Sequence, residues 1–166
     1  PIAVKSMPKF ALKIKCELEN VASFRWEQNN QWCFTVTNAD TSESCEAYLC
    51  KDDELELAGS RGTAHFIKKW PGEQSQSYLK IIDVKKVTGA TEYTAENNGE
   101  EVVILAVEAR GLEPTEWTCK NDFTVTTTGG TTFEEVDVED GIWADYDAEN
   151  DCPVSIQELS GRFEPC

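Results

Sequence analysis

The sequence contains a single histidine, His65, among 166 residues. One imidazole excludes a metal site built from several histidines and leaves any catalytic triad with this one base. The G-x-S-x-G, P-loop and dinucleotide-binding motifs are also absent, so an enzyme would have to work without the common nucleophile and cofactor signatures. Residues 64–67 around His65 are mostly apolar, which makes a structural or surface histidine the simpler interpretation.

Basic residues are scarce: 15 Lys and Arg stand against 31 Asp and Glu, for a net charge of −16. A field of this sign repels phosphate backbones and anionic lipid headgroups, so neither nucleic acid nor a membrane is an expected partner. Long hydrophobic runs are absent as well, since none approaches the roughly 18 residues of a membrane-spanning helix. With 40% hydrophobic and 28% charged residues, the composition is that of a folded globular protein.

Cationic residues are missing altogether between Lys120 and Arg162, while Asp and Glu crowd residues 134–151. A positively charged protein surface or a divalent cation such as calcium could bind this acidic segment. A solvated acidic face is the simpler interpretation, and the segment lacks the glycine-punctuated D-x-D-x-D-G loop of an EF-hand.

C-x-x-C pairs are absent although the chain has seven cysteines. The local sequence therefore contains neither a zinc knuckle nor a thioredoxin-like redox motif. Six of the seven could form three disulfides, which would indicate an oxidising compartment and leave one thiol over. The six candidates are Cys16, Cys33, Cys45, Cys50, Cys119 and Cys152.

Apolar residues alternate with polar ones from Phe10 to Leu18, which predicts a half-buried strand. Residues 102–107 are apolar on both faces and rich in β-branched side chains, which predicts a central strand. Further alternating runs are Trp32-Phe34-Val36, Ala47-Leu49, Leu79-Ile81, Phe123-Val125 and Val154-Ile156. Gly, Pro and Asn separate these runs, so the chain is expected to form one antiparallel, all-β sandwich domain. Only short helical turns are expected, one of them near residues 141–146.

A few polar residues are placed where they could bind or react. Asp145 and Asp147 flank Tyr146 in a loop-like stretch, but acid–base catalysis by two carboxylates requires environments that push their pKa values apart. Glycines at 59 and 62 would present Arg61 with little steric cover. Arg110 begins the Arg-Gly-Leu-Glu-Pro turn that leaves the apolar strand, where the carboxylate is Glu113.

Several of these motifs, taken in order, resemble the eukaryotic CXXC-motif-containing zinc-binding protein family. They are Leu18-Glu19-Asn20, Gly59-Ser60-Arg61-Gly62 with Ala64, Arg110-Gly111-Leu112-Glu113-Pro114, Trp143 with Asp145-Tyr146-Asp147, and the terminal Cys166. The resemblance implies a single two-sheet β-sandwich domain over residues 7–166. Residues 1–6 would then be an N-terminal extension, either a cloning remnant or the mature end of an exported chain.

The family's two C-x-x-C pairs form one zinc site, and this chain has lost both. By the spacing within the resemblance, their positions are taken by Asn38, Thr41, Trp70 and Glu73. None of these is a thiolate, and a structural zinc site needs its four ligands, so neither zinc nor another cofactor is expected. Zinc can contribute roughly 10 kcal/mol to folding, and disulfides of about 2–4 kcal/mol each would compensate. Cys166 matches the family's terminal cysteine and is the expected odd thiol.

The resemblance implies a non-enzymatic binding protein, and the cysteine usage indicates that it is secreted. One alternative is a secreted carrier of a small apolar ligand or pigment held by some of the five tryptophans, Trp26, Trp32, Trp70, Trp117 and Trp143. Others are a cytosolic partner of metal-handling proteins, such as a copper chaperone, and an enzyme using Glu113, Asp145 or Asp147 around His65. The candidate binding residues are Arg61, His65, Trp70, Arg110, Glu113, Trp143, Asp145, Tyr146 and Asp147.

Pairing of the cysteines depends on which strands meet. A hairpin of residues 10–18 with residues 31–37, with a bulge near Asn29-Asn30, would bring Cys16 opposite Cys33. Cys45 and Cys50 have odd separation, so on one strand they point to opposite faces and do not pair.

If the protein is exported, most of the six candidate cysteines are oxidised, because a disulfide framework replaces the metal. Thiol titration of the native protein under denaturing, non-reducing conditions is then expected to find about one free cysteine. A count of six or seven would contradict export and return the protein to a reducing compartment.

Overall fold

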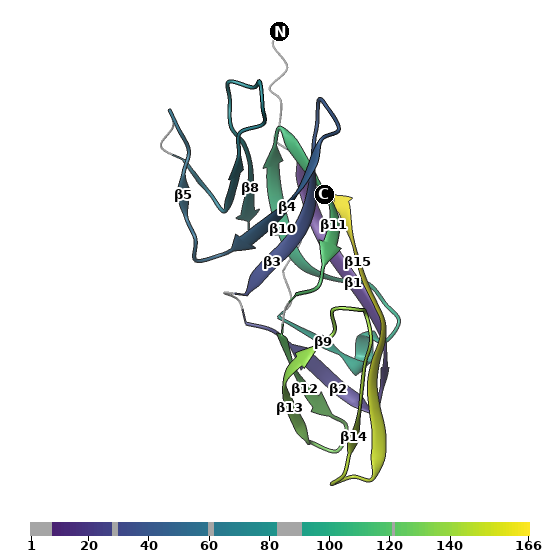
Figure 1. The fold of residues 1–166 in the computed structure, drawn as a ribbon. Coiled ribbons are helices and arrows are strands. Elements are labelled where there is room, and N and C mark those ends of the chain that lie inside the picture. The colour runs from purple at the N-terminus through teal and green to yellow at the C-terminus, as the bar shows by residue number, and fades with distance from the viewer. Residues whose placement is uncertain (1–7, 28–29, 60–61, 83–90, 121) are drawn as a thin grey trace.

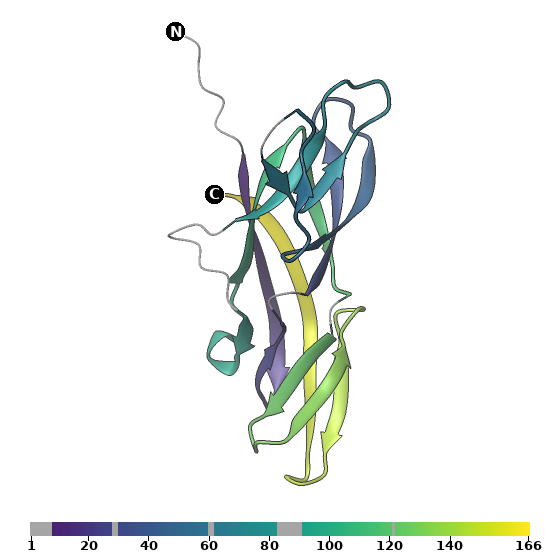
Figure 2. The ribbon, with the colours of Figure 1, turned by 90° about the vertical axis from the view of Figure 1, so that its left-hand side faces the viewer.

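A computed structural model describes residues 8–27, 30–59, 62–82, 91–120 and 122–166. These residues form antiparallel strands, with a single 3-10 turn, η1 (Ala95–Asn97), as their only helical element. The molecule is elongated, and the long strands β1 (Lys9–Glu19) and β15 (Cys152–Pro165) run along most of its length (Figures 1 and 2). The antiparallel all-β fold expected from the sequence is therefore confirmed. No helix among the described residues is long and apolar enough to cross a membrane.

The central sheet has six strands in the order β14-β15-β1-β10-β8-β7. Besides β1 and β15 it contains β7 (Phe66–Lys68), β8 (Ser77–Ile82), β10 (Val102–Arg110) and β14 (Trp143–Asp147). β10 lies inside the sheet between β1 and β8, and its middle residues, 104–107, are buried. Burial on both faces explains the uninterrupted apolar run that predicted a central strand.

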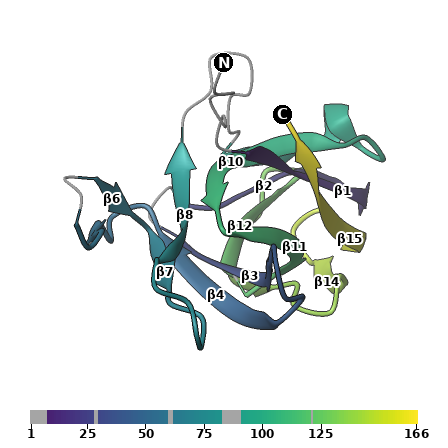
Figure 3. The same ribbon diagram turned by 90° about the horizontal axis from the view of Figure 1, so that it is seen from above.

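Three smaller sheets complete the two lobes of the molecule. The upper lobe in Figure 1 adds β11-β3-β4 and β5-β6, and Figure 3 shows β3 and β4 opposite β1 and β10. The lower lobe adds β13-β12-β2-β9. The strands of the upper lobe are β3 (Gln31–Asn38), β4 (Ser44–Cys50), β5 (Leu55–Glu56), β6 (Thr63–Ala64) and β11 (Leu112–Thr118), and those of the lower lobe are β2 (Val21–Arg25), β9 (Glu92–Thr94), β12 (Asp122–Thr127) and β13 (Thr132–Asp137).

Each lobe has its own aromatic packing around the shared strands. In the upper lobe Phe34 of β3 meets Phe163 of β15 edge-on, with ring centroids 4.8 Å apart. In the lower lobe Phe24 lies 5.4 Å from Tyr93 and 5.0 Å from Phe123. Such pairs contribute about 0.5–1.5 kcal/mol each beyond the area they bury. The first holds a sheet of the upper lobe to the central sheet, whereas the other two join neighbouring strands of the lower-lobe sheet.

The expected hairpin of residues 10–18 with residues 31–37 is wrong. Asn20, at a φ of 54°, turns the chain out of β1, and β2 then pairs with β12 and β9 in the lower lobe. β1 pairs with β10 and β15, whereas β3 belongs to another sheet, so Cys16 and Cys33 are not on neighbouring strands. Part of the suggested bulge, Asn29, lies outside the described residues.

All seven cysteines lie in the described part of the chain and are present as thiols. Cys45 and Cys50 both belong to β4, as expected, and only Cys45 packs against the buried core. The separation of these two thiols by strand alternation is therefore confirmed.

The helical turn expected at residues 141–146 is also wrong, because this segment forms β14. Trp143 pairs with Ile156 of β15 and packs edge-on against Phe133 of β13, with ring centroids 5.3 Å apart. These contacts outweigh local preference, which is the usual reason that short strands escape sequence analysis.

Gly111 permits the tight turn from β10 to β11 at a φ of +74°, and a Cβ there would lie 2.4 Å from Ser77 Oγ. We expect Gly111→Ala to destabilise the protein more than Gly130→Ala, since Gly130 has a φ of +93° but open space around it. The backbone conformation should cost about 1–2 kcal/mol at both sites, and the clash about 1–3 kcal/mol more at Gly111. Denaturant unfolding measures both.

The same measurement in a Ser77→Ala background separates the two causes. Removing the hydroxyl should reduce the cost of Gly111→Ala towards that of Gly130→Ala. Equal costs for the two alanine variants in the unaltered background would contradict the clash.

Candidate functional site

Asn38, at the end of β3, is a buried polar residue with every side-chain group engaged. It is 2% exposed, and its Nδ2 donates a hydrogen bond to Glu73 Oε1 at 3.0 Å. Its Oδ1 accepts from the backbone N–H of Asp40 at 2.9 Å, while its own backbone N–H donates to Glu43 O at 2.7 Å. Asn38 thereby closes the β3–β4 turn and ties it to the segment that follows β7.

Trp70 and Glu73 form the second half of this contact. The Glu73 N–H donates to Trp70 O at 3.1 Å, which closes a turn through Gly72 at a φ of +82°. The Trp70 ring is 2% exposed, and Lys68 Nζ lies 5.5 Å from its centroid. Thr41 points elsewhere, since its hydroxyl donates to Glu43 Oε1 at 3.0 Å. The four positions assigned to the family's zinc site thus lie on two turns that meet through Asn38 and Glu73.

These residues do not fit a zinc ion. The Asn38 amide is already bonded at both ends, and an indole N–H such as that of Trp70 is a donor that cannot act as a ligand. Glu73 is the only carboxylate among the four positions. Across the described ranges of the chain, no group of three or more His, Cys, Asp or Glu side chains is arranged to hold a metal. The arrangement instead links two turns by a hydrogen bond beside a buried aromatic ring.

His65 is held as a structural residue beside β8, near the β7 edge of the central sheet. Its Nδ1 accepts a hydrogen bond from the Ile81 N–H at 3.0 Å, and its backbone N–H donates to Leu79 O at 2.9 Å. Burial lowers the pKa of the imidazole and outweighs a hydrogen bond to the Lys51 backbone, which raises it. His65 is therefore neutral near pH 7, with Nδ1 occupied.

Arg110 borders an open cavity of about 510 Å³, lined also by Tyr78, Lys80 and Glu108. Gly59 and Gly62 lie on its rim, whereas Arg61 lies outside the described residues. Glu113 is exposed on β11 beyond the Gly111 turn, paired in register with Thr37 of β3. It is not among the residues that line the cavity.

The Asp147 carboxylate is fully buried at the far end of the molecule. Its oxygens accept hydrogen bonds from the hydroxyls of Thr127 at 2.9 Å and Thr131 at 2.8 Å, and from the Asn150 amide at 2.7 Å. Burial raises the pKa of Asp147, but these hydrogen bonds together outweigh it and hold the pKa below its ordinary value. Asp147 thus ties the β12–β13 hairpin to the β14–β15 hairpin as a structural anion.

The other candidates on β14 have separate roles. Asp145 is exposed and its carboxylate accepts from the Tyr146 N–H at 2.7 Å. Tyr146 is 50% exposed, and its hydroxyl donates to the Asp151 carboxylate. Trp143 packs on Phe133. Because β14 is one edge of the central sheet and His65 bonds to β8 towards the other, the structure does not bring these carboxylates to the imidazole.

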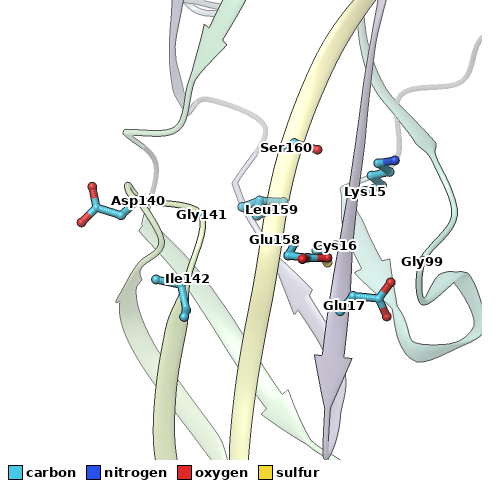
Figure 4. A pocket seen from close by; sticks show the side chains of 10 residues that line it. All are labelled: Lys15, Cys16, Glu17, Gly99, Asp140, Gly141, Ile142, Glu158, Leu159 and Ser160. Carbon is cyan, nitrogen blue, oxygen red and sulfur yellow. The ribbon is translucent and has the colours of Figure 1, made fainter.

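Sequence analysis missed a groove of about 650 Å³ lined by β1, β15 and the turn that leads into β14 (Figure 4). Ile142 and Leu159 lie on one side of it, and Glu158 and Glu17 lie towards β1. The register of β1 and β15 shifts beside Cys16, where Glu158 and Leu159 line the groove. The alternation of apolar residues continues through β1 and gives no sign of this bulge. The cation-free run before Arg162 was the one available indication.

We expect a double-mutant cycle on Asn38→Ala and Glu73→Ala to give a coupling of about 1–2 kcal/mol, because the buried amide meets a half-buried carboxylate. Thr41→Ala with Glu43→Ala is the matched control, since that pair has the same 3.0 Å separation but is exposed. Its coupling should stay below about 0.5 kcal/mol. Equal couplings, measured by denaturant unfolding, would contradict a special role for Asn38 and Glu73.

Known proteins share this architecture over almost the whole chain. A family model described as "CXXC motif containing zinc binding protein, eukaryotic" matches residues 11–164. The proteins of that name from Rattus norvegicus and Homo sapiens are 28% and 27% identical over 164 residues, covering 96% of this chain and 100% of each relative. A solved structure titled "Hypothetical protein from Plasmodium falciparum" superposes with a TM-score of 0.82 at 30% identity, covering 95% of this chain and 100% of that one. The chain therefore belongs to the eukaryotic CXXC motif containing zinc binding protein family.

Proposed function

We propose that this protein is a non-catalytic binding protein that uses its family's scaffold without zinc. The observation that carries the proposal is the contact between Asn38 and Glu73, 3.0 Å apart, at positions that the family resemblance assigns to metal ligands. Two turns that a metal would cross-link are held together here by a side-chain hydrogen bond, with Trp70 buried beside them. Without a metal centre, such a protein would act by binding other molecules through its surface.

The residues best suited to catalysis are committed to structure, which supports a binding role. His65 accepts from the Ile81 amide. Asp147 accepts from two hydroxyls and an amide. A general base has to reach a substrate proton with a free acceptor, so neither group is placed for that work.

The alternatives have less support from the packing. A ligand or pigment between the layers would compete with rings that already fill this space, such as Trp26, whose centroid lies 5.9 Å from that of Phe123. Trp117 likewise lies over Gly161, where an added Cβ would meet the indole at 2.5 Å. Docking to metal-handling proteins would have to proceed without the C-x-x-C thiolates.

Export from the cell remains a prediction that rests on cysteine usage. Cys16 and Cys33 belong to different sheets, so their pairing is not proposed again. The thiol count given above decides the compartment, because seven titratable thiols would match the thiols of the structure and remove the argument for export.

Elemental analysis of the purified protein is expected to find far less than one zinc per chain, and chelators should leave thermal stability unchanged. The reason is that Asn38, Thr41, Trp70 and Glu73 offer no thiolate. A chain carrying all four of these residues as cysteine, refolded with zinc, is the positive control. Close to one zinc per unaltered chain would contradict the proposal and require a site built from other residues.

A further inference from the structure

The groove between β1, β15 and the turn before β14 has an apolar floor and an acidic rim. Ile142 is 57% exposed, the highest value among the exposed large hydrophobic residues of the described chain, and Leu159 lies beside it. Gly99 and Gly141 also line the groove and leave it open because they have no side chains. Figure 4 shows Asp140 at the β14 side of the groove and Glu17 on the opposite side.

A β-bulge places another carboxylate in this groove. The register of β1 and β15 shifts between Lys15 and Glu17, where two residues of β15 stand opposite Cys16. One of them is Glu158, a non-glycine residue at a φ of 54°. Bulges of this kind redirect a side chain, and Glu158 lines the groove together with Asp140 and Glu17. A left-handed backbone at such a residue costs about 1–2 kcal/mol. The strand pairing on either side of the bulge offsets this cost.

The charge around the groove is one-sided. Lys15 is the one basic residue among those that line it, against three carboxylates. β13, β14 and the turns that join them to β15 come from the stretch between Lys120 and Arg162, which has no Lys or Arg. Low-dielectric walls concentrate such a field and favour positively charged partners.

We propose that this groove, lined by Glu17, Asp140, Ile142, Glu158 and Leu159, docks a basic segment of a partner protein that carries an apolar anchor residue. The anchor would lie on Ile142 and Leu159, and Lys or Arg side chains on either side would meet the three carboxylates. Apolar contact at the centre with charge complementarity at the rim is the usual organisation of a specific interface. The proposal rests on the proposed binding function and names its surface.

Other occupants fit this chemistry less well. A second copy of the chain carries the same net charge of −16, so its approach is opposed unless a basic patch faces the groove. Nucleic acid and anionic membranes are repelled by the carboxylates. A divalent cation would be drawn to the rim but would leave the exposed Ile142 unexplained, and no metal-holding group of side chains occurs within the described ranges.

The test uses a fluorescein-labelled ten-residue peptide of four arginines and two leucines among Gly and Ser, with analogues that replace Arg by Gln or Leu by Ser. Fluorescence anisotropy on the full chain should show the parent peptide binding about tenfold or more tighter than either analogue. Asp140→Asn with Glu158→Gln should weaken it about tenfold, and Ile142→Ser by a similar factor. Circular dichroism and thermal unfolding check that each variant is folded.

The matched control is Glu19→Gln with Glu134→Gln, which removes the same number of charges from exposed positions that do not line the groove. It should change the affinity by less than about twofold. Equal losses from both pairs, equal binding of the Arg-to-Gln analogue, or no measurable binding of the parent peptide would overturn the proposal. Displacement by calcium, but not by sodium at equal ionic strength, would assign the groove to a cation instead. None of these outcomes affects the zinc measurement, so the two proposals fail separately.

Discussion

Both lobes depend on the pairing of β1 with β15, strands from opposite ends of the chain. Their ladder begins with Phe10 opposite Pro165 and continues to Glu19 opposite Ser155. Phe34 of the upper lobe packs on Phe163. Phe133 of the lower lobe packs on Trp143 of β14, which pairs with Ile156, so each lobe attaches at a different stretch of β15. A ladder that joins the chain ends closes a very long loop, which slows folding more than it lowers final stability.

The interruption of this ladder connects the groove to the core. At the bulge beside Cys16 the backbone departs from regular pairing, and Tyr93 fills the position behind it. The Tyr93 hydroxyl lies 2.5 Å from Asn97 O and 2.7 Å from Glu100 O, and its single proton is shared between these two acceptors. The Gly99 N–H donates to Cys16 O at 2.9 Å. Burial raises the pKa of the Cys16 thiol to about 12, so it remains protonated and unreactive beneath the groove. The thiol that lines the groove beneath its carboxylates is therefore not a reactive group.

What the sequence could predict follows from how each segment is buried. β1 and β10 were predictable because alternation in one and continuous apolarity in the other report burial on one face or two. β11 was not, since Pro114 interrupts it; the proline stands at a register shift, where a strand tolerates the missing donor. β14 was not predicted because its carboxylates suggest a loop. Asp147 can nevertheless be buried, since hydroxyls of the neighbouring hairpin donate hydrogen bonds to it. The conformation of such segments depends on contacts with distant parts of the chain, and a single sequence does not show which contacts form.

Whether side-chain contacts could take the place of a metal, as proposed, can be judged from the energies involved. A hydrogen bond to a charged group contributes about 1.5–3 kcal/mol, whereas structural zinc can supply roughly 10 kcal/mol or more in a small domain. The Asn38–Glu73 bond thus cannot equal a zinc ion in energy, and Trp70 adds apolar burial at the cost of an indole N–H without a partner among the described residues. A chain of 166 residues does not need full replacement, because burial rises with size and the continuous core reaches from Trp70 to Ile156. Under the proposal the hydrogen bond has the narrower role of holding the two turns together, while the large core maintains the fold.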